Sequence, residues 1–367
     1  MINSSNKIRA GIIGCGGIAG GKHIPGLIKA GVDIVAFCDL IPERAEAAVS
    51  LAKDYGSTYE GAKCYTDYKE LLKDETIDIV HVCTPNRAHS FISIDALEAG
   101  KHVMCEKPMA ITSADAKKML DTARRTGKIL SIGYQNRFGA QTRYLKHIAD
   151  KGVFGDIYYA EALALRRRGV PTWGVFLDEN EQGGGPLIDI ATHSLDQTLW
   201  ILNNYKPKYC VGTAYHKMGK TPPEEQCGQW GSWDPEKFNV EDAAFGYVVM
   251  ENGATIIVRS SWVLNIKKDL GGPSVICGTK AGYEKEGKDV VINGVRNGEL
   301  YADTIDLSQD SETLKECNLT GETWWQNWVE SVKNNVDALV KPEEAYVVTQ
   351  ILEGIYESAK TGDIYRF

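Results

Sequence analysis

A glycine-rich turn between two apolar segments near the N-terminus limits what this chain can fold into. The apolar run Ile8–Ile13 is followed by Gly14–Ala19 (GCGGIA) and a helix-compatible segment that extends to Ala30. A second apolar run, Ile34–Cys38, then ends in Asp39. The order strand, glycine turn, helix, strand and carboxylate predicts a βαβ unit that binds a dinucleotide.

Each residue type in this turn has a physical role in such a unit. Gly14 permits a tight turn, Gly16 lets a pyrophosphate approach the backbone, and Ala19 allows close packing of helix on strand. The free N–H groups of the helix start face the phosphates. Asp39 accepts hydrogen bonds from both ribose hydroxyls of NAD and repels a 2′-phosphate. Because Arg44 could turn towards such a phosphate, NADP is disfavoured but not excluded.

The chain of 367 residues predicts two domains, because it exceeds the usual size of one core. Strands alternate with helices up to Ile129–Tyr134, which indicates a doubly wound parallel sheet with ligands at the carboxyl ends of its strands. Later strands lack intervening helices and include the hairpin signal Asn252-Gly253, so a mostly antiparallel sheet is expected. We therefore predict a Rossmann domain over 1–135 and an α+β domain over 136–367, whose C-terminal helix could pack back on the first domain.

Composition excludes several classes of partner. The net charge of −8 argues against nucleic acid and against an anionic membrane surface. Nine cysteines without a CxxC pair indicate a reduced, cytoplasmic protein without disulfides or structural zinc. The N-terminal MINSSNK lacks an apolar signal region, and no stretch of about 20 apolar residues is present, so export and membrane insertion are not expected.

Asp189 and His193 are the first candidates for chemistry in the second domain. They lie four residues apart in a predicted helix, Leu187–Leu202, and therefore share one face. Histidine titrates in the range that suits the removal of a hydroxyl proton, and a carboxylate one turn away can orient it or bind substrate. In the alternative interpretation, His193 caps the glycine-rich turn and Asp189 is solvated. The preceding segment Gly183–Gly185, where a ligand can approach the backbone, favours a catalytic role for the two residues. A third possibility is that they bind a metal ion, but no further metal ligand lies nearby in the sequence.

Lys107 follows a predicted strand, between Glu106 and Pro108. A lysine at such a position is usually a solvated charge. In a cofactor cleft its ammonium would instead stabilise alkoxide character on a substrate oxygen. Pro108 fixes the local backbone, and the sequence does not decide whether its peptide bond is cis.

Several motifs together resemble the Gfo/Idh/MocA family of oxidoreductases, whose members act mostly on sugars, cyclitols and related polyols. The matching segments are the Gly14–Ala19 turn, Thr84-Pro85-Asn86 with His89, Glu106-Lys107-Pro108 and Gly183–Asp196 (GGGPLIDIATHSLD). The segment Tyr356–Gly362 also resembles the closing helix of the family. The resemblance covers nearly the whole chain.

The resemblance implies a role for each matching residue. Lys107 would polarise the substrate, His193 would accept a proton, and Asp189 would bind substrate or assist the histidine. Four further residues would line the nicotinamide and its ribose: Thr84, Asn86, His89 and Glu106. The expected cofactor site then comprises Gly14, Gly16, Gly17, Ile18, Ala19, Asp39, Arg44, Thr84, Asn86, His89, Glu106 and Lys107.

The substrate is less constrained. Arg166–Arg168 could bind a carboxylate or phosphate, or form a solvated turn. Trp173 could pack on a sugar ring or belong to the core; similarity of its loop to one branch of the family favours a cleft. Trp230 and Trp233 could cover an aglycone, although loop anchoring is favoured. The expected substrate residues are Lys107, Asn136, Arg137, Arg168, Trp173, Asp189 and His193.

The sequence thus predicts an NAD-dependent dehydrogenase of a sugar, glycoside or cyclitol, with oxidation of a glucoside at C3 as the preferred case. One alternative is a hydrolase or lyase in which tightly held NAD is recycled. Another is a non-catalytic NAD-binding regulator, which would not need the complete set Lys107, Asp189 and His193. An exposed sheet face in the second domain predicts a homo-oligomer.

Overall fold

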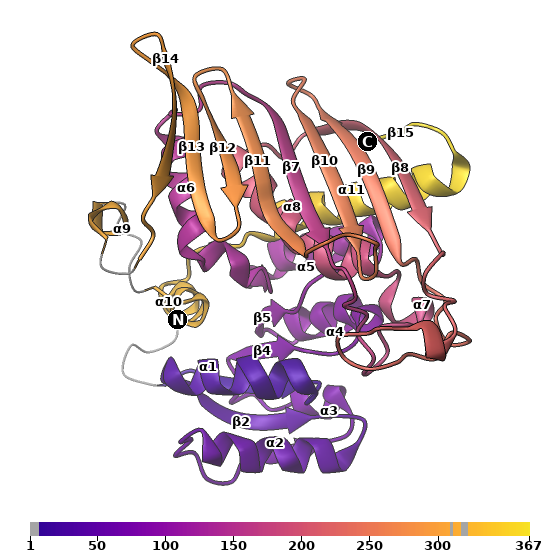
Figure 1. Ribbon diagram of the computed structural model, residues 1–367. Helices are drawn as coiled ribbons and strands as arrows, with labels where there is room; N and C mark the ends of the chain where they lie inside the picture. Colours follow the sequence, from indigo (N-terminus) through magenta and orange to yellow (C-terminus); the bar gives the residue numbers. More distant parts are fainter. Residues whose placement is uncertain (1–6, 309–310, 317–321) are drawn as a thin grey trace. The chain divides into compact units, whose positions relative to one another are not determined.

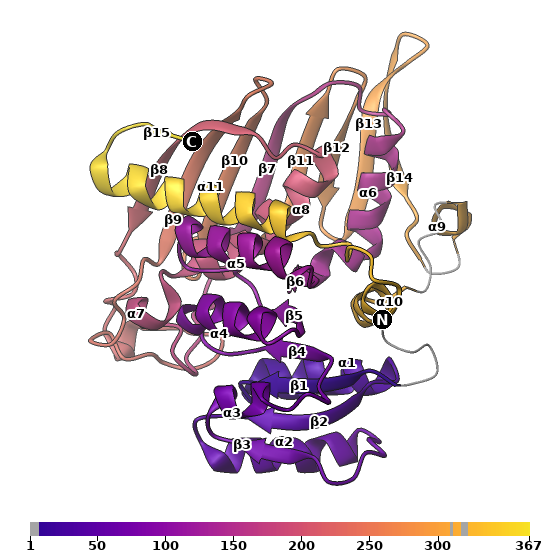
Figure 2. The same cartoon turned by 180° about the vertical axis from the view of Figure 1, so that it is seen from behind.

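The computed structural model describes residues 7–308, 311–316 and 322–367. The chain divides into two compact units (Figures 1 and 2). The first comprises Met1–Gly133 with Glu322–Tyr346, and the second comprises Tyr134–Gly321 with Val347–Phe367. A segment within the range predicted for the second domain, Glu322–Tyr346, is therefore part of the first unit.

The first unit contains a parallel sheet of six described strands in the order β3-β2-β1-β4-β5-β6. Its strands are β1 (Arg9–Ile13), β2 (Asp33–Cys38), β3 (Lys63–Tyr65), β4 (Ile79–Val82), β5 (His102–Cys105) and β6 (Leu130–Ile132). Its helices are η1 (Ala19–His23), α1 (Ile24–Lys29), α2 (Pro42–Asp54), α3 (Tyr68–Leu72), α4 (Asn86–Glu98), α5 (Ser113–Thr126) and α10 (Trp324–Asn334). The predicted doubly wound parallel sheet is confirmed, and the strand order reverses beside β1, where such sheets bind ligands.

Local sequence sets the ends of these helices. Thr112 precedes α5, and its hydroxyl accepts a hydrogen bond from the backbone N–H of Asp115. The same helix ends at Gly127, which has a left-handed φ of +66°. Further along the chain, α10 packs on α1 through Trp325, whose indole occupies the space where a side chain at Gly26 would lie. Gly26 is therefore required for α1 and α10 to approach each other.

The second unit contains a sheet of nine described strands in the order β14-β13-β12-β11-β7-β10-β9-β8-β15. Only the β7–β10 pairing is parallel among the pairings described. The strands are β7 (Ile157–Leu165), β8 (Pro207–Tyr215), β9 (Ala243–Met250), β10 (Thr255–Ser261), β11 (Leu270–Gly278), β12 (Ala281–Glu286), β13 (Asp289–Arg296), β14 (Glu299–Ile305) and β15 (Tyr365–Arg366). The mostly antiparallel second sheet is confirmed, including a turn at Asn252-Gly253, where Gly253 has a φ of +89°.

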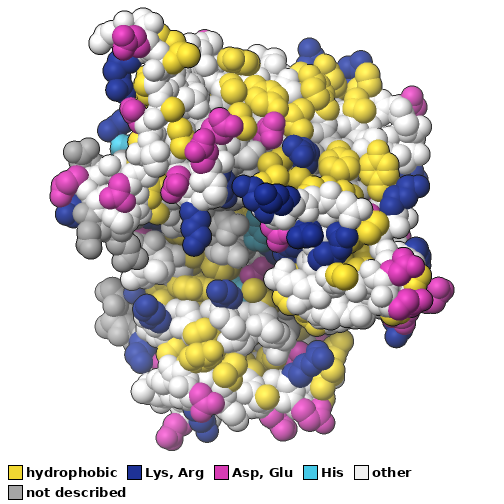
Figure 3. All heavy atoms as spheres, in the orientation of Figure 1, with side chains coloured by type: hydrophobic (Ala, Val, Ile, Leu, Met, Phe, Trp, Pro, Cys, Tyr) yellow, Lys and Arg dark blue, Asp and Glu magenta, His cyan; other side chains and the backbone are white. Residues whose placement is uncertain are grey.

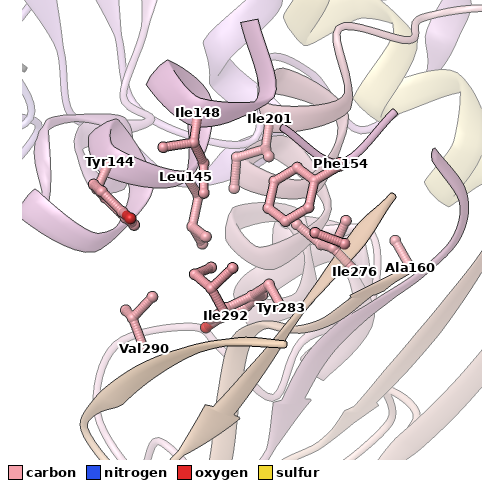
Figure 4. Close-up of a cluster of buried hydrophobic side chains, with 11 residues drawn as sticks. Tyr144, Leu145, Ile148, Phe154, Ala160, Ile201, Ile276, Tyr283, Val290 and Ile292 are labelled. Carbon is pink, nitrogen blue, oxygen red and sulfur yellow. The ribbon is translucent and has the colours of Figure 1, made fainter. Parts of the chain in front are cut away.

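Helices cover one face of this sheet (Figure 2). The helices of the second unit are η2 (Gln135–Phe138), α6 (Ala140–Asp150), α7 (Glu179–Gln182), η3 (Leu187–Ala191), α8 (Thr192–Leu202), η4 (Pro223–Glu225), α9 (Glu312–Glu316) and the greater part of α11 (Pro342–Thr361). Figure 4 shows side chains of α6 and α8 packed against strands β7, β11, β12 and β13. Phe154, Ile276 and Tyr283 are almost completely buried there.

The other face of the sheet presents apolar side chains. Along β8 and β9 the residues alternate between buried and exposed, as expected for a sheet covered on one side. Val211 and Tyr247 lie opposite each other on the exposed side and remain 41% and 46% accessible. Figure 3 shows hydrophobic side chains gathered over these strands.

Arg137 has a structural role, and its predicted contact with substrate is wrong. Its side chain is fully buried and forms an ion pair with Asp196, which is also fully buried. The Nε of Arg137 donates to Oδ2 of Asp196 at 2.9 Å, and the guanidinium lies 5.5 Å from the centre of the Trp200 ring. The neighbouring Asn136 is exposed on η2. Because both side chains of this ion pair are fully buried, the guanidinium of Arg137 serves to fix α8 against η2.

Replacing Arg137 by methionine should strongly destabilise the protein, because Asp196 would retain a buried charge without its cation. We expect a loss of about 3–5 kcal/mol in the free energy of unfolding, measured by urea denaturation. The control is Arg296→Met, which removes an exposed ion pair with Asp303 and should cost about 0–1 kcal/mol. Equal losses in the two variants would contradict the structural role of the buried pair.

Candidate functional site

The glycine turn follows β1 and has the conformation that the sequence predicts. Gly14 has a φ of +89°, and a Cβ there would lie 2.7 Å from the backbone of Cys83. A Cβ at Gly16 or Gly17 would meet open space. Gly14 is therefore required by the packing of the turn on the strand end, whereas Gly16 and Gly17 leave the approach to the turn clear. Ile18 is 38% exposed, and the next residue of the turn, Ala19, is fully buried at the start of η1.

Asp39 is tied to this turn. One carboxylate oxygen accepts from the backbone N–H of Cys15 at 2.9 Å, and the other accepts from that of Ile41 at 2.9 Å. Each oxygen retains a further lone pair that a ribose hydroxyl can use. Arg44 lies exposed in the first turn of α2. The turn and the carboxylate fit a dinucleotide, since they offer open backbone at one point and an anchored acceptor at another.

The loops that follow β4 and β5 carry the remaining candidates of the first unit. The Oγ1 of Thr84 is buried and has no hydrogen-bond partner among the described residues. Asn86 begins α4 and is 8% exposed. Lys107 is half-buried, and its peptide bond to Pro108 is cis. The carboxylate of Glu106 is nearly buried and accepts from the backbone N–H of Lys107 at 3.1 Å.

His89 does not face a cofactor, and its predicted role is corrected. The ring is 1% exposed, with Nδ1 2.7 Å from the carbonyl of Pro108 and Nε2 2.9 Å from that of Thr84. Burial lowers the pKa of His89, while the two carbonyls favour its protonated form. The imidazole thus joins the loops after β4 and β5 and leaves no ring nitrogen for nicotinamide.

In the second unit, Asp189 and His193 lie on one continuous helical segment. Asp189 belongs to the π-helical turn η3, and His193 lies in the first turn of α8. Asp189 is 8% exposed, and its Oδ2 accepts from the indole N–H of Trp262 at 3.0 Å. This burial contradicts the alternative of a solvated carboxylate. The ring of His193 is half-buried and meets that of Tyr134 edge to face at 6.1 Å.

The glycines that precede this helix allow close packing within the protein. The sequence had instead suggested that they let a ligand approach the backbone. A Cβ at Gly184 would lie 2.2 Å from the hydroxyl of Tyr356, and one at Gly185 would lie 2.1 Å from the carbonyl oxygen of Glu241. The triple glycine therefore lets the chain pass close to Tyr356 of α11 and to Glu241, two residues before β9. It does not by itself indicate a ligand.

Glu241 holds the start of this helix in place. Its carboxylate is buried and accepts from the backbone N–H groups of Gly185 at 2.6 Å and Leu187 at 3.0 Å. The hydroxyl of Tyr356 donates to the same carboxylate at 2.9 Å and accepts from the N–H of Ile188 at 3.3 Å. Burial raises the pKa of Glu241 to about 7, although the three hydrogen bonds favour its ionised form. Sequence reasoning missed Glu241 because no motif surrounds it.

The arginine-rich loop after β7 also differs from the prediction. Arg168 donates to the carbonyls of Arg167 and Leu264 and to the side chain of Asn265, so it joins two loops. The charge of Asp189 acts on Arg166. Burial lowers the pKa of Arg166, and its guanidinium lies 5.2 Å from the centre of the Trp230 ring.

The tryptophans of the second unit fall into two groups. Trp233 is 4% exposed and donates to the carbonyl of Gly219, which shows that it anchors its loop. Trp173 and Trp230 are 50% and 38% exposed and meet edge to face at 5.1 Å. The hydroxyl of Thr172 donates to the carbonyl of Trp230 at 2.7 Å. An anchored and exposed aromatic pair therefore lies next to Arg166.

Two other site classes receive no support. Within residues 7–308, 311–316 and 322–367, no group of three or more His, Cys, Asp or Glu side chains is placed to hold a metal ion. Across the same described residues, none of the helices combines the length and apolar character that a membrane span needs.

The free energy of unfolding should depend on pH because Glu241 titrates. Because folding raises its pKa from 4.5 to about 7, its contribution is fully present below pH 4.5 and is lost as the pH rises through about 7. The free energy of unfolding of wild type relative to Glu241→Gln, measured by urea denaturation between pH 5 and 8, should fall by about 2–3 kcal/mol at most. Parallel pH curves for the two proteins would contradict this.

Comparison with known proteins identifies the family to which both parts of the chain belong. Residues 8–134 match the model of an oxidoreductase family with an NAD-binding Rossmann fold, and residues 146–366 match that family's C-terminal alpha/beta domain. The chain is 35% identical over 363 residues to D-glucoside 3-dehydrogenase of Escherichia coli (strain K12), covering 98% of this chain and 97% of that protein. It is 32% identical over 350 residues to inositol 2-dehydrogenase of Salmonella typhimurium (strain LT2), covering 92% and 94%.

Two solved structures share the fold. Levoglucosan dehydrogenase in complex with NADH is similar with a TM-score of 0.80 and 18% identity, over 98% of this chain and 99% of that chain. Aldose-aldose oxidoreductase from Caulobacter crescentus, complexed with glycerol, is similar with a TM-score of 0.75 and 22% identity, over 99% and 100%. Since the family models together span most of the sequence, this chain belongs to the Gfo/Idh/MocA family of oxidoreductases.

Proposed function

We propose that this oxidoreductase transfers hydride between a secondary hydroxyl of a carbohydrate and NAD, and that its reaction is the oxidation of a glucoside at C3. The similarity to D-glucoside 3-dehydrogenase, which extends over 98% of this chain, is the observation that carries the proposal. Similarity to inositol 2-dehydrogenase supports the broader class of cyclic polyols. The presence of Lys107, Asp189 and His193 supports catalysis over mere binding.

NAD, when bound, supplies the hydride acceptor. The protein supplies the groups that bind the substrate hydroxyl and accept its proton. His193 accepts that proton, and the ammonium of Lys107 stabilises the negative charge that develops on the oxygen. Asp189, held by the indole of Trp262, binds the hydroxyl or assists the imidazole. Orientation by these three groups contributes to the rate as much as proton transfer does.

The proposed cofactor is NAD in preference to NADP. The carboxylate of Asp39, which is fixed by two backbone N–H groups, would lie near a 2′-phosphate and repel it. Arg44 is exposed on α2, where it remains a possible partner for that phosphate.

The substrate is proposed to be a glycoside whose aglycone meets aromatic surface. Trp173 and Trp230 provide exposed rings fixed by each other and by Thr172. Apolar faces of sugars and aglycones pack on such rings. We also propose that the apolar face around Val211 and Tyr247 joins two copies of the chain, because large exposed apolar areas mark association surfaces.

Product identification tests the reaction directly. Purified protein is incubated with a panel of glucosides and cyclitols and with NAD or NADP, and products are identified by mass and NMR. We expect a 3-keto glucoside together with NADH. Release of the aglycone without accumulation of NADH would instead support a redox-assisted hydrolase or lyase. Absence of turnover with every polyol, keto sugar and glycoside would support a non-catalytic NAD-binding protein.

Replacing His193 by alanine tests the proton acceptor. Turnover should fall by about 10²–10⁴-fold, because the hydroxyl proton loses its base, while NAD affinity stays unchanged. NAD affinity is measured by fluorescence titration and turnover by product formation. The matched control is His147→Ala on α6, which should retain wild-type turnover. Wild-type turnover in the His193 variant would refute the role.

A further inference from the structure

Four buried side chains of the first unit form one continuous hydrogen-bonded chain. The indole Nε1 of Trp328 lies 3.0 Å from Nε2 of His81, and Nδ1 of His81 lies 2.8 Å from Nδ1 of His23. The Nε2 of His23 then lies 2.8 Å from Oε1 of Glu106. Trp328, His81 and His23 are fully buried, and Glu106 is 5% exposed. The chain thus links α10, β4 and η1 to the Glu106-Lys107-Pro108 loop.

The chemistry of the indole determines where every proton in this chain lies. An indole N–H only donates, so Nε2 of His81 accepts and the proton of His81 is on Nδ1. Nδ1 of His23 must then accept, which places the proton of His23 on Nε2, from where it is donated to Glu106. A second proton on His23 would oppose the N–H of His81 at 2.8 Å. His23 is therefore neutral in this arrangement, although it contacts a carboxylate.

We propose that the indole N–H of Trp328 fixes the tautomers of His81 and His23, and so holds Glu106 as a fully charged, oriented acceptor beside Lys107. Glu106 receives a neutral donor from His23 at one oxygen and the backbone N–H of Lys107 at the other. Trp328, His81 and His23 are positioning residues that act through Glu106. The proton positions do not depend on the proposed function. The inference rests on that function only where it assigns Glu106 a role in cofactor binding.

The surroundings support this proton arrangement. Burial lowers the pKa of His81 well below its usual range, which agrees with a neutral His81 that accepts at Nε2. The charge of Glu106 also acts on Cys83 and Cys105, but burial raises the pKa of both thiols, so they remain neutral. The other titratable groups at this loop are His89 and Lys107. The side chains of α10 that contact His23 and His81 are indoles, which carry no charge.

Removal of the indole N–H should reverse the direction of the hydrogen bond between His81 and His23. In Trp328→Phe, His81 is free to carry its proton on Nε2 and to accept at Nδ1. His23 can then donate from both nitrogens, as an imidazolium between His81 and Glu106. The negative charge of Glu106 would be neutralised by an ion pair, and its hydrogen bonds to other groups would weaken.

The matched control is Trp324→Phe. Trp324 lies on the same helix, its ring contacts His23 edge to face at 5.6 Å, and its own indole N–H has no hydrogen-bond partner among the described residues. This variant removes a comparable volume beside His23 without changing the hydrogen-bonded chain.

Nitrogen-15 NMR of histidine-labelled protein reads the proton positions directly, with His23→Gln and His81→Gln used for assignment. In the wild type we expect neutral His81 with its proton on Nδ1 and neutral His23 with its proton on Nε2. His23 should carry protons on both ring nitrogens in Trp328→Phe but only on Nε2 in Trp324→Phe. A cationic His23 or reversed tautomers in the wild type would overturn the proposal, even if Trp328→Phe does not fold.

NADH affinity gives the functional reading and needs no substrate. In Trp328→Phe the NADH affinity should be roughly threefold to tenfold lower than in the wild type, the range expected when one charge-assisted hydrogen bond is weakened. The affinity of Trp324→Phe should equal that of the wild type. A doubly protonated His23 in Trp328→Phe with wild-type NADH affinity would refute the effect on Glu106. Since neither measurement involves turnover, failure of the proposed reaction is seen separately, in the product assay.

Discussion

Burial of a glutamate among backbone N–H donors is the interaction on which the second unit depends. A buried carboxylate is costly unless donors surround it, and Glu241 has two backbone N–H groups and the hydroxyl of Tyr356. These bonds fix the start of the helix that carries Asp189 and His193. The close approach explains why Gly184 and Gly185 have no side chain. The position of the proposed proton acceptor is thus set by residues far from it in the sequence.

Both units place their candidate residues next to a π-helical turn. In the first unit η1 ends at His23, and in the second η3 contains Asp189. Such turns occur mostly inside longer helices and frequently at functional sites, because the extra residue changes the direction of the side chains that follow. In each unit a buried glutamate, Glu106 or Glu241, hydrogen-bonds to the π-helical turn or to the residues around it. Helix irregularity and buried charge therefore occur together.

Neutral hydrogen bonds and full charges have different effects in these sites. The pair Arg137–Asp196 places two opposite charges in the core and fixes structure. The contact of His23 with Glu106 has the geometry of an ion pair, but the donor character of Trp328 makes it a bond from a neutral ring. The first arrangement cancels a charge, whereas the second preserves it next to Lys107.

The sequence by itself determined the fold class, the glycine turn with Asp39, the helix with Asp189 and His193, and the family, because these depend on local periodicity and on short motifs. It did not reveal strands β12 and β14, and it did not reveal the partners of His89, Arg137 and Arg168. Those three side chains find their partners in Pro108, Asp196 and Leu264, which the sequence cannot place beside them. Only the tertiary structure decided which polar side chains form hydrogen bonds within the protein, because the hydrogen bonds of buried groups depend on contacts between segments that are distant in the sequence.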